Sequence, residues 1–188
     1  NFDKKYDIFY TGNILPRAKL FKKLVIPILL NTNHVCVGGG SGPGSMLPEL
    51  NNQPVDFFEK YNLNAMCRIS VSYDIQPNPS RINQMKESGV SFKYTDWGEP
   101  YFVQYKARTF EPFFCKSLVL HYKDDFRILE EFCTPDKHFI YFDNVNDFKE
   151  KSKYILENYH EFEPMIEETF KYAVENFTVE SFFEKYLR

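Results

Sequence analysis

The stretch Ala107–Asp143, with the sequence ARTFEPFFCKSLVLHYKDDFRILEEFCTPDKHFIYFD, decides the expected fold. After a short opening helix, its apolar pattern predicts a buried strand at Ser117–His121, an amphipathic helix at Phe126–Phe132 and a second strand at Lys137–Phe142. Strands that alternate with helices in this way build a parallel sheet with helices on its faces. The predicted fold class is therefore α/β, with a Rossmann-like parallel sheet flanked by helices.

The flanking residues extend this pattern in both directions. Further strands are predicted at Tyr6–Tyr10, His34–Val37 and Arg68–Tyr73, and helices at Arg17–Leu30 and Pro54–Met66. Three extra C-terminal helices are predicted at Asp147–Glu157, Phe162–Val174 and Val179–Leu187. Pro27 is expected to kink or end the first helix, because proline removes a backbone donor and clashes with the preceding turn.

The segment between the strand at Arg68–Tyr73 and the opening stretch does not fit the alternation. Asp74–Ser80 contains two prolines and is predicted to be a loop, and a brief helix follows at Arg81–Glu87. We interpret Val90–Tyr105 as an insertion. Its aromatic residues include the only tryptophan, Trp97, and they can form a lid, stack on a base or sugar, or pack into the core.

Composition limits the classes of function. A chain of 188 residues is expected to form one domain, here residues 1–188, with a sizeable core. The net charge of −3 gives no basic footprint for nucleic-acid binding. The four cysteines lie far apart in apolar contexts, which favours buried thiols over disulfides.

The sequence shows no secretory signal and no transmembrane segment, since the apolar run Leu24–Leu30 is too short to cross a bilayer. The expected location is therefore the cytoplasm. The chain opens on Asn1 and not on methionine, so we interpret it as a piece of a longer, two-domain protein.

A glycine run, Gly38–Gly44, follows the second predicted strand. It lacks the lysine of a phosphate-binding P-loop, and its glycines do not fit the spacing of a dinucleotide-binding turn. We interpret the run as a loop that lines the cleft at the carboxyl end of the sheet.

Several motifs together resemble the donor-binding half of "group 1" glycosyltransferases of GT-B architecture. These are R-T-F-E-x-x-x-C-x-S-L-V-L from Arg108, L-E-E-F from Leu129 and K-H-F-I-Y-F-D from Lys137, with Tyr6–Asn13 near the start of the chain. The similarity spans nearly all 188 residues. It implies a single C-terminal GT-B half, which binds a nucleotide-diphosphate sugar for transfer to a sugar, glycan or other hydroxyl acceptor. It also implies an N-terminal acceptor domain that this sequence does not contain.

The resemblance and the residue types together give a set of candidate site residues. Arg17 and Arg108 are the catalytic candidates, because each opens a predicted helix where a cation and free N–H groups can stabilise a departing diphosphate. For each arginine, a solvated or salt-bridged surface position is the alternative. Glu111, expected in a first helical turn beside Pro112, matches the family's ribose-binding glutamate; the alternative is a helix-dipole residue. The remaining donor-binding candidates are Gly12, Asn13, Thr109 and His121.

No D-x-D triplet and no His/Cys cluster indicates a metal site, so transfer is expected to be independent of metal and of any cofactor beyond the donor substrate. The family often carries a second acid eight residues before the ribose-binding glutamate, where this chain has Val103. That departure leaves two alternatives open: a non-catalytic nucleotide-binding or interaction module of the same fold, and a GT-B sugar-nucleotide epimerase.

Overall fold

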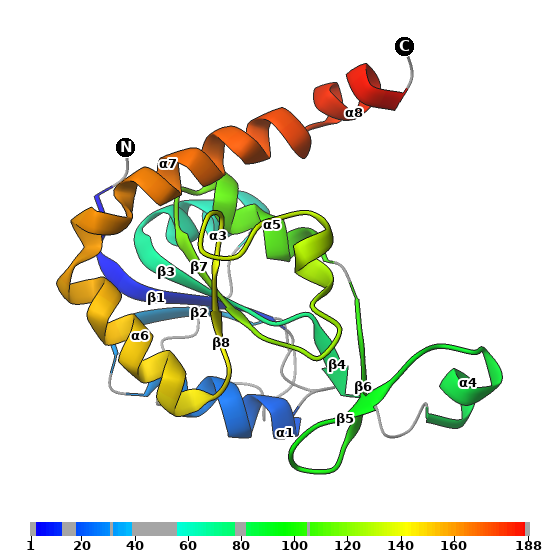
Figure 1. Ribbon diagram of the computed structural model, residues 1–188. Helices are drawn as coiled ribbons and strands as arrows, with labels where there is room; N and C mark the ends of the chain where they lie inside the picture. Colours follow the sequence, from blue (N-terminus) through cyan, green and yellow to red (C-terminus); the bar gives the residue numbers. More distant parts are fainter. Residues whose placement is uncertain are drawn as a thin grey trace.

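A computed structural model describes residues 3–12, 18–30, 32–38, 56–77, 82–104 and 106–186. Its main sheet has five parallel strands in the order β2-β1-β3-β7-β8 (Figure 1). They are β1 (Tyr6–Thr11), β2 (His34–Val37), β3 (Cys67–Ser72), β7 (Leu118–Tyr122) and β8 (Ile140–Phe142). The predicted parallel, Rossmann-like sheet is therefore confirmed.

The first helical region changes its hydrogen-bonding pattern along its length. It consists of α1 (Ala18–Leu20), the π-helical segment η2 (Phe21–Val25) and α2 (Ile26–Leu29). Pro27 lies near the start of α2, directly after the π-helical turns. Because proline cannot donate to the preceding turn, a change in the hydrogen-bonding pattern is expected there, and α2 ends at Leu29, two residues after Pro27.

The longer helices α3 (Phe57–Ala65), α5 (Ala107–Phe114), α6 (Val145–Glu157) and α7 (Tyr159–Asn176) cover the sheet, and α8 (Val179–Tyr186) extends beyond the end of α7, away from the strands (Figure 1). The predicted α-helix at Phe126–Phe132 is wrong, since only one 3₁₀ turn, η4 (Ile128–Glu131), forms there. The Asp124 carboxylate accepts the backbone N–H groups of Phe126 and Arg127, and Arg127 has a left-handed backbone with φ of 50°. A left-handed residue cannot continue a right-handed helix.

The predicted insertion, Val90–Tyr105, contains β5 (Lys93–Tyr94) and β6 (Pro100–Val103). These strands form a small antiparallel sheet with β4 (Ile75–Pro77), in the order β4-β6-β5, which projects from the lower right of the main sheet in Figure 1. The helix α4 (Ile82–Glu87) lies between β4 and β5 in the chain. β4 corrects the prediction of a loop at Asp74–Ser80. A proline is tolerated here because β4 is an edge strand and Pro77 is its last residue.

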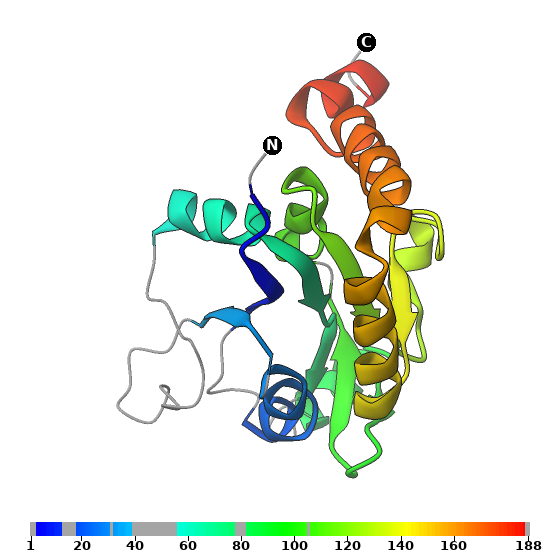
Figure 2. The same ribbon diagram turned by 90° about the vertical axis from the view of Figure 1, so that its left-hand side faces the viewer.

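Alternating side chains of the strands fill a core on each face of the sheet. Ile8 and Tyr10 face the layer that contains α1, η2, α2 and α6, whereas Phe9 faces α3. Val119 of β7 packs on the α5 and α7 side. Figure 2 shows α3 and α6 on opposite sides of the sheet. All four cysteines are buried and free, as predicted, and Trp97 of the insertion packs against the core.

Candidate functional site

The order of the strands places a crevice between the carboxyl ends of β1 and β3. After β1 the chain adds β2 on one side, then crosses to add β3 on the other side. At such a switch point the connections leave in opposite directions, and ligands of open α/β sheets bind there. A narrow cleft lies at this position and is lined by Tyr10, Thr11, Val71, Ser72, Tyr73 and Arg108.

Gly12 lets two side chains of this cleft approach the backbone. Its N–H donates to the carbonyl of Val37 at 3.1 Å. A Cβ atom at this position would lie 2.5 Å from the Tyr10 hydroxyl and 3.3 Å from Nη1 of Arg108. Any larger residue would displace one of them. The structure thus brings together Gly12 and Arg108, two of the residues singled out by sequence.

Arg108 is the second residue of α5 and reaches the cleft from the sheet's α5 side. It is half-buried. Within the described parts of the chain, no carboxylate forms an ion pair with its guanidinium and no acceptor forms a hydrogen bond with it. A half-buried guanidinium without such a partner has five N–H donors available for an anion, and their planar arrangement matches the oxygens of a phosphate.

Three buried polar residues stand behind this arginine. Asp74 follows β3, Thr109 is the third residue of α5, and His121 lies in β7 opposite Ser72 of β3. The Thr109 hydroxyl donates to Oδ1 of Asp74 at 2.6 Å, and Oδ2 of Asp74 lies 3.8 Å from Nε2 of His121. At most 1% of any of the three residues is exposed.

This burial bears on two sequence predictions. Thr109 and His121 are predicted to contact a donor; in the structure neither side chain reaches the solvent, and the Thr109 hydroxyl donates to Asp74. Asp74 was not predicted as a site residue. The available signal was its position, because it is the first carboxylate after a buried strand at the ligand edge of the sheet.

Burial shifts the pKa of two groups among these buried residues, His121 and Asp74. It lowers the pKa of the His121 imidazole from 6.5 to about 3, and the nearby Lys106 ammonium adds to this effect. The ring is therefore neutral at physiological pH. Burial raises the pKa of Asp74, which the hydrogen bond from Thr109 and the charges of Lys106 and Arg108 oppose.

Glu111 faces a different part of the molecule. It is the fifth residue of α5, which begins at Ala107, so the prediction that it lies in the first turn is wrong. Its Oε2 accepts from Nζ of Lys60 on α3 at 2.7 Å, with 12% and 17% of the two side chains exposed. It lines a groove of about 390 Å³ together with Tyr61, Phe110, Phe114, Asn176, Phe177 and Thr178. Ribose binding by Glu111 stays a prediction.

Other predicted site residues lie outside the described residues. These are Arg17, Asn13 and the glycine run from Gly39 onward.

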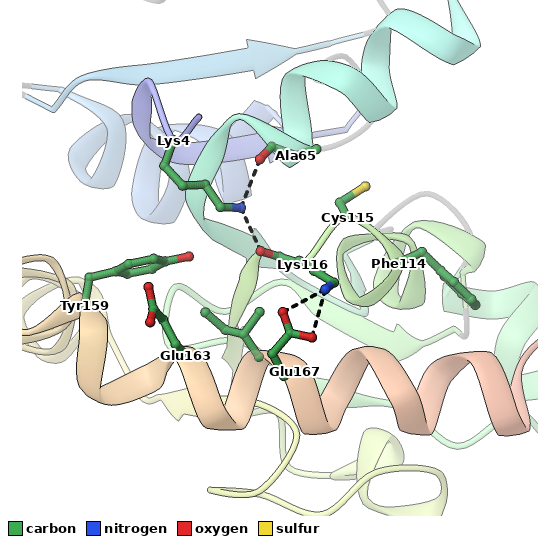
Figure 3. A pocket seen from close by; sticks show the side chains of 9 residues that line it. Lys4, Ala65, Phe114, Cys115, Lys116, Tyr159, Glu163 and Glu167 are labelled. Atoms are coloured by element: carbon green, nitrogen blue, oxygen red, sulfur yellow. Dashed lines mark hydrogen bonds and ion pairs between the residues drawn. The ribbon is translucent and has the colours of Figure 1, made fainter. Parts of the chain in front are cut away.

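A cavity of about 540 Å³ lies at the opposite edge, near the amino ends of β1, β3 and β7 (Figure 3). Lys4 spans it, with Nζ donating to the carbonyls of Ala65, Cys67 and Lys116 at 2.9, 2.9 and 2.7 Å. All three ammonium protons are therefore used within the protein, and Lys116 is paired with Glu167. Because ligands of open parallel sheets bind at the carboxyl ends, we assign the candidate site to the smaller cleft at Arg108.

Two further searches cover the described residues alone. Among them, no three His, Cys, Asp or Glu side chains are grouped so that they could hold a metal ion. Within the same ranges, no helix combines the length and apolarity required to cross a bilayer.

Comparison with known proteins identifies the fold. No family model and no curated protein matches the chain. Among solved structures, 95% of the chain is similar to 89% of the C-terminal domain of a glycosyl transferase group 1 family protein, LpcC, from Francisella tularensis, with a TM-score of 0.56 and 9% identity. The whole chain is similar to 35% of TarM, with a TM-score of 0.63 and 15% identity. The predicted fold, that of a GT-B C-terminal half, is thereby confirmed, and the chain spans about a third of TarM.

The buried imidazole predicts a specific sensitivity to acid. Between pH 6.5 and 3 the unfolded chain binds a proton at His121 that the folded chain excludes. Stability should therefore fall with pH in this window, by up to about 1.4 kcal/mol per unit from this residue. His121→Gln should lose less stability than the parent between pH 7 and pH 5, by about 2 kcal/mol, in urea unfolding.

The matched control is His160→Gln, because His160 is exposed on α7. It should follow the parent. An unchanged pH dependence in folded His121→Gln would show that the imidazole is not excluded from protonation.

Proposed function

We propose that this chain is the donor-binding half of a glycosyltransferase and that it binds a nucleotide-diphosphate sugar at the carboxyl edge of β1 and β3. One observation carries the proposal. In a fold shared with a group 1 C-terminal domain, Arg108 lies at the switch point of the sheet and forms no ion pair with a described residue. A half-buried cation in that position needs an anionic partner, and a diphosphate provides one.

Arg108 would act on the leaving group. When the bond between sugar and diphosphate breaks, negative charge grows on the departing phosphate oxygens. A guanidinium that is already fixed beside them stabilises this charge without reorganisation, and such electrostatic stabilisation contributes several kcal/mol to lowering a barrier. Gly12 contributes by letting the Arg108 guanidinium lie close to the backbone at this edge, and Arg17 is proposed as a second cation at the same edge. Transfer in this scheme requires no metal ion.

Glu111 is proposed to hold the donor ribose. Its carboxylate can accept two hydroxyl hydrogen bonds, and the aromatic groove around it, with Tyr61 and Phe110, offers flat surfaces for a base. Lys60 occupies one carboxylate oxygen in the structure. Ribose binding would therefore use the other oxygen or displace Lys60.

The acceptor hydroxyl is proposed to come to the cleft from another part of a larger protein. The chain spans about a third of TarM, and GT-B enzymes form the acceptor site between two domains. We expect the 188 residues to bind the nucleotide part of the donor and to transfer sugar only together with a partner domain.

A non-catalytic nucleotide-binding module is the second candidate. Its supporting observation is the Lys60–Glu111 ion pair, because a carboxylate held in an internal pair is less available to a ribose. The position of the family's upstream acid is also apolar here, at Val103. Both candidates require the diphosphate to bind at Arg108, and a transfer assay with the proposed two-domain protein would separate them.

Removal of Arg108 should weaken diphosphate binding selectively. Arg108→Ala is expected to reduce the affinity for a nucleoside diphosphate about 10- to 100-fold, because one charge-assisted contact is lost. The affinity for the bare nucleoside should hardly change, since it has no phosphate. Binding should weaken as salt rises and should persist in EDTA.

Calorimetry on the two ligands measures this difference, and Arg127→Ala is the control because Arg127 lies exposed in the turn before η4. Equal losses for nucleoside and diphosphate would contradict the role of Arg108. Abolition of binding by EDTA would show a metal site among residues that sequence and structure do not indicate.

The role of Glu111 can be separated from its ion pair with Lys60. Glu111→Gln should weaken nucleoside diphosphate binding about tenfold if the carboxylate holds the ribose, because hydrogen bonds to a charged acceptor are lost. Lys60→Met should leave that affinity unchanged or raise it, since it frees the carboxylate. Equal effects of the two substitutions would mean that only the ion pair between α3 and α5 matters.

A further inference from the structure

The electrostatic environment of Arg108 raises a physical question. Asp74 and Arg108 are neighbours in the structure, because Asp74 follows Tyr73, which lines the cleft with Arg108, and accepts from Thr109, the residue after Arg108. Burial raises the pKa of the Asp74 carboxyl group, and the charge of Arg108 is among the influences that oppose this. A carboxylate and a guanidinium in such a partly buried setting attract each other, because little water screens them. Nevertheless, no ion pair joins Asp74 and Arg108.

The two oxygens of Asp74 point elsewhere. Oδ1 accepts from the Thr109 hydroxyl at 2.6 Å, a short distance for a hydrogen bond to a carboxylate. Oδ2 lies 3.8 Å from Nε2 of His121, and neither atom has a hydrogen-bond partner among the described residues. That separation is too long for a hydrogen bond, but a small movement of either side chain would close it and satisfy both buried atoms.

His121 is suited to the second contact. The ring is fully buried and lies at 5.9 Å, centre to centre, from those of Phe139 and Tyr141 on β8. In the neutral ring, an Nε2–H can donate toward Asp74. The other charged groups around Asp74 are Lys106, at the N-cap of α5, and Asp124, after β7. Lys106 is occupied by the carbonyls of Tyr73 and Asp74 at 3.3 and 3.4 Å.

We propose that the Thr109 hydroxyl, with His121 beside the other carboxylate oxygen, holds the Asp74 carboxylate away from Arg108, so that the guanidinium remains available to an anion in the cleft. Thr109 and His121 are thus positioning residues, and neither touches the ligand. Asp74 is the group they restrain. Its hydrogen bond with Thr109 fixes the first turn of α5 beside the end of β3, without neutralising Arg108 by a direct pair. The anion at Arg108 rests on the proposed function, whereas the restraint on Asp74 does not.

The proposal predicts an unusual pattern in a double-mutant cycle. Thr109→Val removes the hydroxyl at nearly constant shape, so Asp74 should turn to Arg108 and pair with it. Asp74→Asn keeps an acceptor for Thr109 but removes the charge, so Arg108 should stay available. In the double variant, Asp74→Asn should rescue the defect of Thr109→Val, because no carboxylate is left to capture Arg108. If these residues only stabilised the fold, the double variant would be at least as defective as either single variant.

Modification by phenylglyoxal, which reacts with accessible guanidinium groups, tests this without any ligand. In the folded chain, Arg108 is expected to react about tenfold more slowly in Thr109→Val than in the parent, because an ion pair between Asp74 and Arg108 must open before the reagent can react. Asp74→Asn and the double variant should react at least as fast as the parent. Thr109→Ser, which keeps the hydroxyl, is the matched control and should resemble the parent; peptide mass spectrometry reads the rate at Arg108.

The outcomes are distinct. An unchanged rate in Thr109→Val, or a double variant that is as slow as Thr109→Val, would overturn the proposal. If Thr109→Val does not fold, Thr109→Ala takes its place, and an unchanged rate at Arg108 in that variant would overturn the proposal. Slower labelling of Arg108 in Asp74→Asn would also overturn it, because loss of the carboxylate should not make the arginine less accessible. Binding of inorganic pyrophosphate is measured on the same variants. If the parent binds none while the labelling pattern holds, the restraint on Asp74 stands and the proposed function fails.

Discussion

The parallel pairing of β1 with β3 is the constraint on which the rest of the structure depends. The register Tyr10↔Val71 sets the carboxyl ends of these strands side by side. The chain places β2 on one side of β1 and then β3 on the other side, so the order of the strands switches direction at this pair. The residues of the candidate site are placed by that reversal. Gly12 directly follows β1, Asp74 lies two residues after β3, and Arg108 in the first turn of α5 lines the cleft between the two strands.

The site combines a half-buried cation in the cleft with fully buried polar residues behind it. Arg108 reaches the cleft, while Asp74, Thr109 and His121 form a polar layer behind it on the α5 side of the sheet. Buried polar groups of this kind are costly unless they are paired, and their cost makes their geometry specific. The larger cavity at the amino edge shows the opposite arrangement, because the Lys4 ammonium there is fully engaged by three carbonyls.

The fold could largely be predicted from the sequence because it depends on periodicity. The strand at His34–Val37 was predicted to the residue, and the alternation in Ala107–Asp143 was enough to predict a parallel sheet. The predictions failed where one local contact outweighs a pattern. The Asp124 carboxylate and a left-handed Arg127 reduce an apparent helix to a 3₁₀ turn. β4 forms in a proline-containing segment because β6 pairs with it, a contact that the segment itself does not reveal.

The site was predictable only in part. Gly12 and Arg108 adjoin elements whose order was correctly predicted, and the structure places them together. Sequence position could not show that Thr109 and His121 point inward, since this depends on which face of α5 and β7 the other layers cover. For the same reason Asp74 was missed, and Glu111 was not expected to pair with Lys60, which is 51 residues away in the chain.

The central claim is that an anionic nucleotide binds at the carboxyl edge of β1 and β3. The most direct measurement is a titration of the isotopically labelled chain with nucleoside diphosphates of each common base, followed by amide chemical shifts in NMR spectra. The account predicts saturable shifts at Thr11, Gly12, Ser72 and Arg108, with Lys4 and Lys116 at the amino edge unmoved. Shifts confined to the amino-edge cavity, or no saturable shift with any base, would contradict it.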